Sequence, residues 1–460
     1  MIYFLILVGI YGLKVLLKMH WIASVVTGIL LFAMLPKHRK QYRRMQEENN
    51  RFLEATEYLD SLLYAFSKDE KVERALTDVE AALMDGKMKE KVREALEHLR
   101  MTFDDSDVMK DALGIIENAY PCSRIHTAHD FIVHVEQYGG RIEHPIGLLL
   151  SDKKRWENRI LAAMKERKKM FTDIVMSISA SLVICGIILY LPVMNMDISQ
   201  NAVCQVLTVV AIFLDDMIFL RAQRFLSVDW LKLDVTTSKE DGKRMQEYHS
   251  YEENKAVRLS ILFAAPFAVG TFVCLYLGKE LWTLGFLLLM TLMLNQHRVG
   301  HHLLRKNLIK SIKCAFPNWL MDIVLLLQSE NVQMAIRKSM PQAQPVLSGA
   351  ITEMTEQMEM QPESAAPFHA FLQEFAIPEV HSAMSMLFSV SMGQSNQADK
   401  QLKELIDRNL QMLDITEKER INNLGSGMYL LFLAPVLTAS FKLVVDMGIF
   451  MLSFLTSAGI

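Results

Sequence analysis

Three carboxylates, Asp215, Asp216 and Asp446, lie inside strongly apolar stretches of this 460-residue chain. An ionised carboxylate at the centre of a bilayer costs about 2.5 to 3.5 kcal/mol on insertion scales, so each one needs a partner or a function. Two such acids could form a dyad in which one holds a proton for the other, as in an intramembrane aspartyl protease or a prepilin peptidase. The Gly-x-Gly-Asp sequence typical of those enzymes is absent.

Ion pairing is the structural interpretation of the same acids. Asp446 follows Lys442 by one helical turn, a spacing at which opposite charges meet on a helix surface. Asp216 lies just before Arg221 and Arg224, so either arginine is its expected partner. Contact with a partner protein is the second interpretation of the three acids, and catalysis the third.

Other residues that could bind a metal or a phosphate lack the further ligands that such a site needs. His297 and His301 stand one turn apart, a spacing that can bind metal, and His302 follows, but no cysteine or acid lies near them. We interpret the three histidines as a basic cluster at a membrane boundary. The five cysteines are scattered with no CxxC pair, and no G-x-x-x-x-G-K-[ST] phosphate loop occurs. We therefore predict a non-enzymatic protein with no cofactor and no metal.

Composition indicates a chain that alternates between membrane and water. With 51% hydrophobic and 22% charged residues, it is too apolar for an ordinary soluble protein and too charged to lie wholly in lipid. The net charge of −3 and the lack of basic stretches interleaved with aromatic residues argue against a nucleic-acid partner.

Apolar runs predict about seven membrane helices, each flanked by Lys or Arg on the cytoplasmic side. The predicted membrane parts are an anchor hairpin at residues 1–36, two pairs of helices at 171–221 and 258–295, and a final segment at 425–460. The loop at 194–201 is expected outside. Residues 222–257 read as a cytoplasmic linker with an exposed turn at 239–243.

Helical periodicity without any strand-like alternation predicts two cytoplasmic all-α bundles, at residues 45–170 and 310–424. In the second bundle, Phe316 and Pro317 are expected to begin a helix, because proline is tolerated in a first turn. The predicted fold is therefore an all-α, polytopic membrane protein with two tandem cytoplasmic bundles.

The two bundles look like copies of one unit. Glu70, Val72, Ala75 and Leu76 match Glu330, Val332, Ala335 and Ile336 with a displacement of 260 residues. His126, Thr127 and Ala128 match His381, Ser382 and Ala383, and Asp152 matches Asp407, with a displacement of 255.

The second copy resembles the F domain of type II secretion systems and is most similar to the platform proteins of tight-adherence (Flp) pilus assembly. The resemblance is carried by Ala315-Phe316-Pro317, Pro367-Phe368, Ile377-Pro378-Glu379-Val380, Asp407-Arg408-Asn409, Ala434-Pro435 and Val445-Asp446-Met447. The first copy departs from this pattern, because it lacks the Phe-Pro pair and has Ser123 where the second copy has Pro378.

This resemblance implies a multi-pass platform in the inner or cytoplasmic membrane, with its main soluble domains in the cytoplasm. The implied partners are a hexameric secretion ATPase, pilin or pseudopilin subunits, a second F-domain protein or another copy of the chain, and membrane lipid. The residues expected to contact partners are Phe316, Pro317, Glu379, Asp407, Arg408, Asp215, Asp216 and Asp446. A membrane transporter and an intramembrane aspartyl protease remain the alternative functions.

Overall fold

The computed structural model describes residues 2–101, 108–140, 142–190, 198–232, 239–327, 330–393 and 395–457. Within these ranges the chain is helical and contains no strand. The all-α prediction is confirmed for the described residues.

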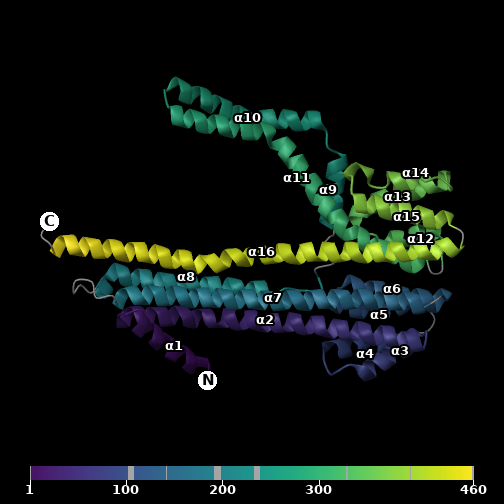
Figure 1. Cartoon of the computed structure of the whole chain (residues 1–460), viewed down its shortest axis with the longest axis horizontal. Helices are drawn as coiled ribbons and strands as arrows, with labels where there is room; N and C mark the ends of the chain where they lie inside the picture. Colours follow the sequence, from purple (N-terminus) through teal and green to yellow (C-terminus); the bar gives the residue numbers. More distant parts are fainter. Residues whose placement is uncertain are drawn as a thin grey trace.

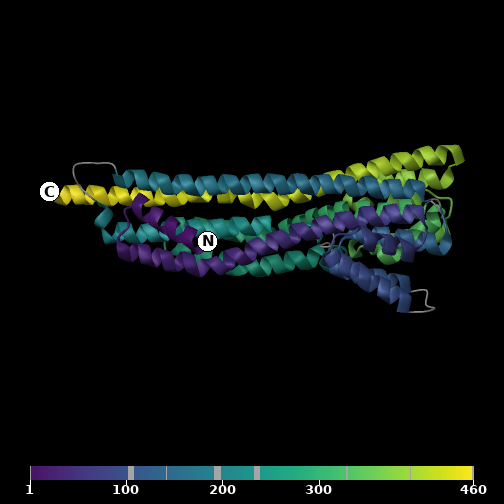
Figure 2. The same cartoon turned by 90° about the horizontal axis from the view of Figure 1, so that it is seen from below.

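Four very long helices organise the molecule. They are α2 (Trp21–Lys68), α7 (Glu143–Tyr190), α11 (Glu280–Leu326) and α16 (Ser395–Ser457). Figure 1 shows α2, α7 and α16 running together along the long axis, and Figure 2 shows the same stack from below. Each helix has an apolar part and a charged part with no interruption between them, so one helix joins an apolar segment to a bundle.

The first bundle contains the end of α2, the start of α7 and four helices between them. These are α3 (Val72–Ala82), α4 (Lys87–Met101), α5 (Val108–Ala119) and α6 (Ser123–Tyr138). Phe52 of α2 meets Trp156 of α7 edge to face, with ring centroids 4.9 Å apart. After α6 the chain turns at Gly139, whose φ of +73° suits a glycine.

The second bundle contains the end of α11, the start of α16 and four helices between them. Between α11 and α16 lie α12 (Val332–Ser339), α13 (Pro345–Met360), α14 (Ala366–Ala370) and α15 (Pro378–Met392), with short 3-10 turns at Met340–Gln342 and Gln373–Phe375. Helices α3 and α12 begin 260 residues apart, and α6 and α15 begin 255 residues apart. The buried apolar side chains of both bundles form one continuous core.

Five of the described helices, α2, α7, α8 (Ala202–Leu226), α10 (Glu253–Tyr276) and α16, are long and apolar enough to cross a membrane. Helix α1 (Ile2–Leu16) has 15 residues and falls short of that length. In Figure 1 the hairpin of α10 and the apolar start of α11 points away from the other long helices.

The turn between α1 and α2 is held by a side chain from a distant helix. Gln205 of α8 donates to the Lys18 carbonyl at 3.0 Å and accepts from the His20 backbone N–H at 3.0 Å. Lys18 itself has a φ of +44°. The amino-terminal anchor hairpin is thus packed against α8, next to the 3-10 turn Ile198–Gln200.

Two local predictions are wrong. Pro317 does not begin a helix, because α11 runs through it from Glu280 to Leu326. Residues 239–243 are not an exposed turn, because they open helix α9 (Lys239–His249), where Asp241 is buried and Gly242 packs against Pro345. In both places tertiary packing outweighs the local signal of a proline or a charged run. The first half of the predicted outside loop at 194–201, residues 194–197, lies outside the described residues.

Candidate functional site

The acid Asp215 lies where α8 packs against α7 and α16, and only 3% of its surface is exposed. It accepts a hydrogen bond of 2.9 Å from the Thr438 hydroxyl of α16 and a longer one of 3.5 Å from the Ser181 hydroxyl of α7. The carboxylate therefore joins three apolar helices through neutral hydroxyl donors.

Asp446 forms the predicted ion pair with Lys442 inside α16, and each residue is 2% exposed. Thr438, the partner of Asp215, lies two turns earlier on the same helix, roughly 12 Å away at 1.5 Å per residue. Asp215 and Asp446 thus sit in separate hydrogen-bonded groups, whereas carboxylates that share one proton stand about 3 Å apart.

The predicted pairing of Asp216 with Arg221 or Arg224 is wrong. Its Oδ1 lies 3.1 Å from His38 Nε2 of α2, and His38 Nδ1 lies 2.8 Å from Gln223 Oε1. Arg221 and Arg224, the expected partners, are exposed. The observed pair ties α2 to α8 where α2 leaves its apolar segment.

Phe316 is a core residue with 1% exposure. Its ring packs near those of Trp319 and Phe371, which stack on each other at 5.3 Å. Trp319 also donates from Nε1 to the Ser339 hydroxyl at 2.9 Å. Phe316 therefore stabilises the second bundle from within, and a partner protein would not reach its side chain.

Pro317 links α11 to α16 through backbone carbonyls. Because proline lacks an N–H, the carbonyl of Lys313, four residues earlier, loses its usual helical partner. The Thr416 hydroxyl of α16 donates to that carbonyl at 3.2 Å, and Asn409 Nδ2 donates to the Pro317 carbonyl at 3.0 Å. A proline in mid-helix thus creates an acceptor that the neighbouring helix uses.

The remaining predicted contact residues lie on the surface of the second bundle. Glu379 pairs with Lys313 at 3.1 Å, and Arg408 contacts Glu404 at 3.4 Å and the Ser382 hydroxyl. Asp407 is exposed beside Arg408. These three side chains are accessible to a partner protein.

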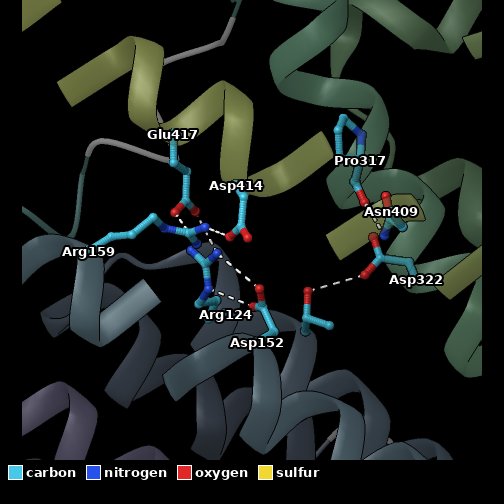
Figure 3. A network of polar contacts seen from close by, with 9 residues as sticks. Arg124, Asp152, Arg159, Pro317, Asp322, Asn409, Asp414 and Glu417 are labelled. Carbon is cyan, nitrogen blue, oxygen red and sulfur yellow. Dashed lines mark hydrogen bonds and ion pairs between the residues drawn. The ribbon is translucent and has the colours of Figure 1, made fainter. Parts of the chain in front are cut away.

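A buried network of charges joins the two bundles (Figure 3). Arg124 of α6 lies 2.7 Å from Asp152 of α7 and 2.5 Å from Glu417 of α16. Arg159 of α7 contacts both Glu417 and Asp414. The side chains of Arg124, Asp152 and Glu417 are 8 to 10% exposed, so the charges neutralise one another largely away from water.

A second polar group lies beside this network. The Thr127 hydroxyl of α6 donates to Asp322 Oδ1 of α11 at 3.1 Å, and both residues line a cavity of about 250 Å³ between the bundles. His126 contacts Glu117 at 2.9 Å and Asp130 at 3.2 Å. No described ion pair involves His381, but its backbone N–H bonds to the Ile377 carbonyl as that of His126 bonds to the Cys122 carbonyl, each at 3.2 Å.

Burial and pairing shift the pKa values in this group in different directions. Burial raises the pKa of Asp322 to about 7. The hydrogen bond with Glu117 raises the pKa of His126 to about 9, against the opposing effect of burial. Burial acts to raise the pKa of Glu117, but hydrogen bonds with His126 and His129 bring it down to about 2. The interface between the bundles therefore carries charge that depends on pH.

Within the described ranges, no group of three or more His, Cys, Asp or Glu side chains could hold a metal ion. His301 instead lies against Tyr248 and Tyr251, with ring centroids 5.0 and 4.2 Å away.

Searches of protein families, curated proteins and solved structures find no match to this chain. The functional argument therefore rests on geometry. The residues that join the bundles most directly, Arg124, Arg159 and Glu417, were not among the predicted site residues. No sequence signal singles them out, because Arg159 and Glu417 lie in charged stretches like those of many exposed helix faces.

Proposed function

We propose that this protein is a non-enzymatic assembly platform of the type II secretion or tight-adherence pilus class, which couples a cytoplasmic ATPase to subunits in the membrane. One observation carries the proposal: α2, α7, α11 and α16 each continue from an apolar segment into a bundle without a break. A rigid helix transmits displacement along its axis, so movement of the bundles would move the membrane segments with them.

The proposal includes a duplicated architecture with about seven membrane helices, five long spans plus α1 and the apolar start of α11. The shared order of helices and the matching displacements of α3 with α12 and of α6 with α15 support the duplication. Basic residues from Lys37 to Arg44 lie where α2 passes from its apolar part toward the first bundle, which favours bundles on the cytoplasmic side of a cell membrane.

The exposed residues Glu379, Asp407 and Arg408 are the proposed contact surface for a hexameric secretion ATPase. Energy must come from such a partner, since the sequence contains no phosphate loop. The exposed apolar faces of the α10–α11 hairpin, including Phe263, Phe272 and Leu284, are the proposed contacts for pilin or pseudopilin helices or for a second F-domain protein.

The transporter and protease alternatives have weaker support. The separate pairing of Asp215 and Asp446 is a poor arrangement for a proton-sharing dyad. A transporter would bring polar groups together around broken helices near the middle of the membrane. The polar groups of the described spans are paired locally instead, between two helices at Asp215 and Thr438 and within one helix at Lys442 and Asp446.

The test is deletion of the gene, followed by measurement of surface filaments and of pilin processing. A platform predicts that filaments disappear while the pilin is still processed. Unprocessed pilin would favour the protease, and intact filaments would contradict the proposal.

The contact surface is tested by complementation with the double variant Glu379→Lys and Asp407→Lys. Reversal of two charges should abolish copurification with the ATPase while the protein remains in the membrane. Asp78→Lys, a reversal at an exposed site of the first bundle, is the matched control and should leave copurification unchanged.

A further inference from the structure

A cavity of about 630 Å³ lies between α2, α7 and α8 at the level where their apolar segments give way to charged sequence. Lys165, Arg167 and Lys168 line one side, and Phe171 and Phe219 line the apolar side. None of the residues that line it is acidic. The cavity is within the size range of ligand pockets and combines positive charge with an apolar wall.

Arg167 is the unusual residue of this cavity. It is 3% exposed, and its guanidinium stacks 4.8 Å from the ring centroid of Trp230. One Nη donates to the Phe225 carbonyl at 3.1 Å. The Nε and the other Nη meet no hydrogen-bond partner among the described residues. No carboxylate of the described chain pairs with it.

An unpaired buried guanidinium is costly, because it has lost water without gaining an anion. A phosphate group would restore the missing hydrogen bonds, since the planar fork of arginine matches two phosphate oxygens. Lys165 and Lys168 would add positive charge at the mouth of the cavity.

The surroundings indicate which phosphate compound fits. The rings of Phe171 and Phe219 lie 5.4 Å apart on the side of the cavity that continues into the apolar segments of α7 and α8. An acyl chain would lie along these rings, while a small, fully hydrated anion would gain nothing from them. The position is also that of lipid headgroups, next to the basic segment that follows Leu35 of α2.

We propose that this cavity binds the phosphate headgroup of an anionic phospholipid, with Arg167 as its principal ligand and the acyl chains along Phe171 and Phe219. A lipid held there fills the space between three membrane helices and neutralises Arg167. This inference does not depend on the platform function.

The test uses the full-length protein in detergent, titrated with an anionic phospholipid and with a zwitterionic phospholipid of the same chains. Bound lipid is counted by native mass spectrometry. The wild type should retain one anionic lipid preferentially. Arg167→Gln should weaken its binding about tenfold or more, the effect of losing a charged hydrogen bond.

The matched control is Lys169→Gln, which removes the same charge two residues away from an exposed side chain that does not line the cavity. It should bind the anionic lipid as the wild type does. The double variant Lys165→Gln and Lys168→Gln changes exposed side chains only and should weaken binding without loss of folding, which covers the case that Arg167→Gln does not fold.

Three outcomes would overturn the proposal. The first is an equal loss of anionic-lipid binding in Lys169→Gln and in the cavity variants. The second is equal binding of zwitterionic and anionic lipid by the wild type. The third is displacement of the lipid by inorganic phosphate at the same concentration. The last result would show a site for a free anion, in which the apolar wall has no role.

Discussion

Buried ionisable side chains in this protein differ in what compensates for their charge. Lys442 and Asp446 neutralise each other within one helix, and His38 and Asp216 meet between two helices. Among the described residues, the hydrogen-bond donor to Asp322 is a neutral hydroxyl, that of Thr127. Such differences lead to different responses to mutation and to pH.

Asp322 should make the protein less stable as the pH rises. Its folded pKa of about 7 lies above the ordinary value of 3.8, so the folded state holds the proton more tightly. The contribution of this proton to the free energy of unfolding is fully present below pH 3.8 and is lost as the pH rises to about 7. Asp322→Asn should therefore stabilise the protein by about 1 to 3 kcal/mol at pH 8 and have little effect at pH 4.

The measurement is thermal unfolding in detergent across this pH range, with Asp78→Asn as an exposed control. His126 also loses its stabilising charge as the pH rises from 6.5 through 9. The difference between the wild type and Asp322→Asn therefore isolates Asp322. An equal pH response in both proteins would contradict the assignment.

The ion pair of Lys442 and Asp446 should behave as a unit. Either Lys442→Met or Asp446→Leu leaves an uncompensated charge between apolar helices and should cost about 3 to 5 kcal/mol of stability. The double variant removes both charges and should recover most or all of the loss. A double variant as unstable as the single ones would indicate that the pair contacts something other than itself.

At the scale of elements, side-chain hydroxyl groups that donate to backbone carbonyls join the long helices, and at Pro317 the proline itself frees the carbonyl. Pro317 releases the Lys313 carbonyl to Thr416, and near Pro435 the Phe432 carbonyl accepts from the Ser177 hydroxyl at 3.0 Å. The first contact joins α11 to α16 in the bundle, and the second joins α16 to α7 among the apolar segments. Only the first contact uses an acceptor that a proline has freed, because the carbonyl four residues before Pro435 is that of Leu431.

The contact at Pro317 can be tested by a rescue experiment. Thr416→Val leaves the Lys313 carbonyl without a donor and should cost about 1 to 3 kcal/mol. In a Pro317→Ala background the residue at 317 has an N–H that can bond to the same carbonyl, so Thr416→Val should cost much less there. Urea or thermal unfolding of the wild type, the two single variants and the double variant gives the coupling energy between Thr416 and Pro317. Equal costs in both backgrounds would refute the role of Pro317.

At the scale of the whole molecule, the two bundles act as one body. They share one apolar core, and Arg124, Arg159 and Glu417 connect α6 and α7 of the first bundle to α16 of the second. A force on the surface of the second bundle would therefore reach α2 and α7 as well as α11 and α16.

Loss of Glu417 should uncouple the bundles. Glu417→Gln removes the carboxylate that neutralises two arginines and should cost about 3 kcal/mol, since breaking a buried pair leaves unpaired charge. It should also make the segments between the bundles easier to cleave with protease. Asp414→Asn removes a carboxylate that is 40% exposed and should cost less than about 1 kcal/mol. Similar effects of the two variants would contradict the assigned importance of Glu417.

Local patterns were sufficient for much of the fold. The all-helical class of the described residues and the pairing of Lys442 with Asp446 agree with the sequence-based expectations. Each depends on neighbours a few residues apart, whose relation follows from helix geometry alone.

The candidate sites depended on tertiary structure instead. His38 meets Asp216 across 178 residues, and Arg124 meets Glu417 across 293. The cavity around Arg167 exists only where three helices leave a space unfilled. Periodicity along one helix determines which residues share a face, and so the sequence by itself determined the helices and their apolar faces. Which faces meet depends on how whole helices pack, and this only the tertiary structure decided.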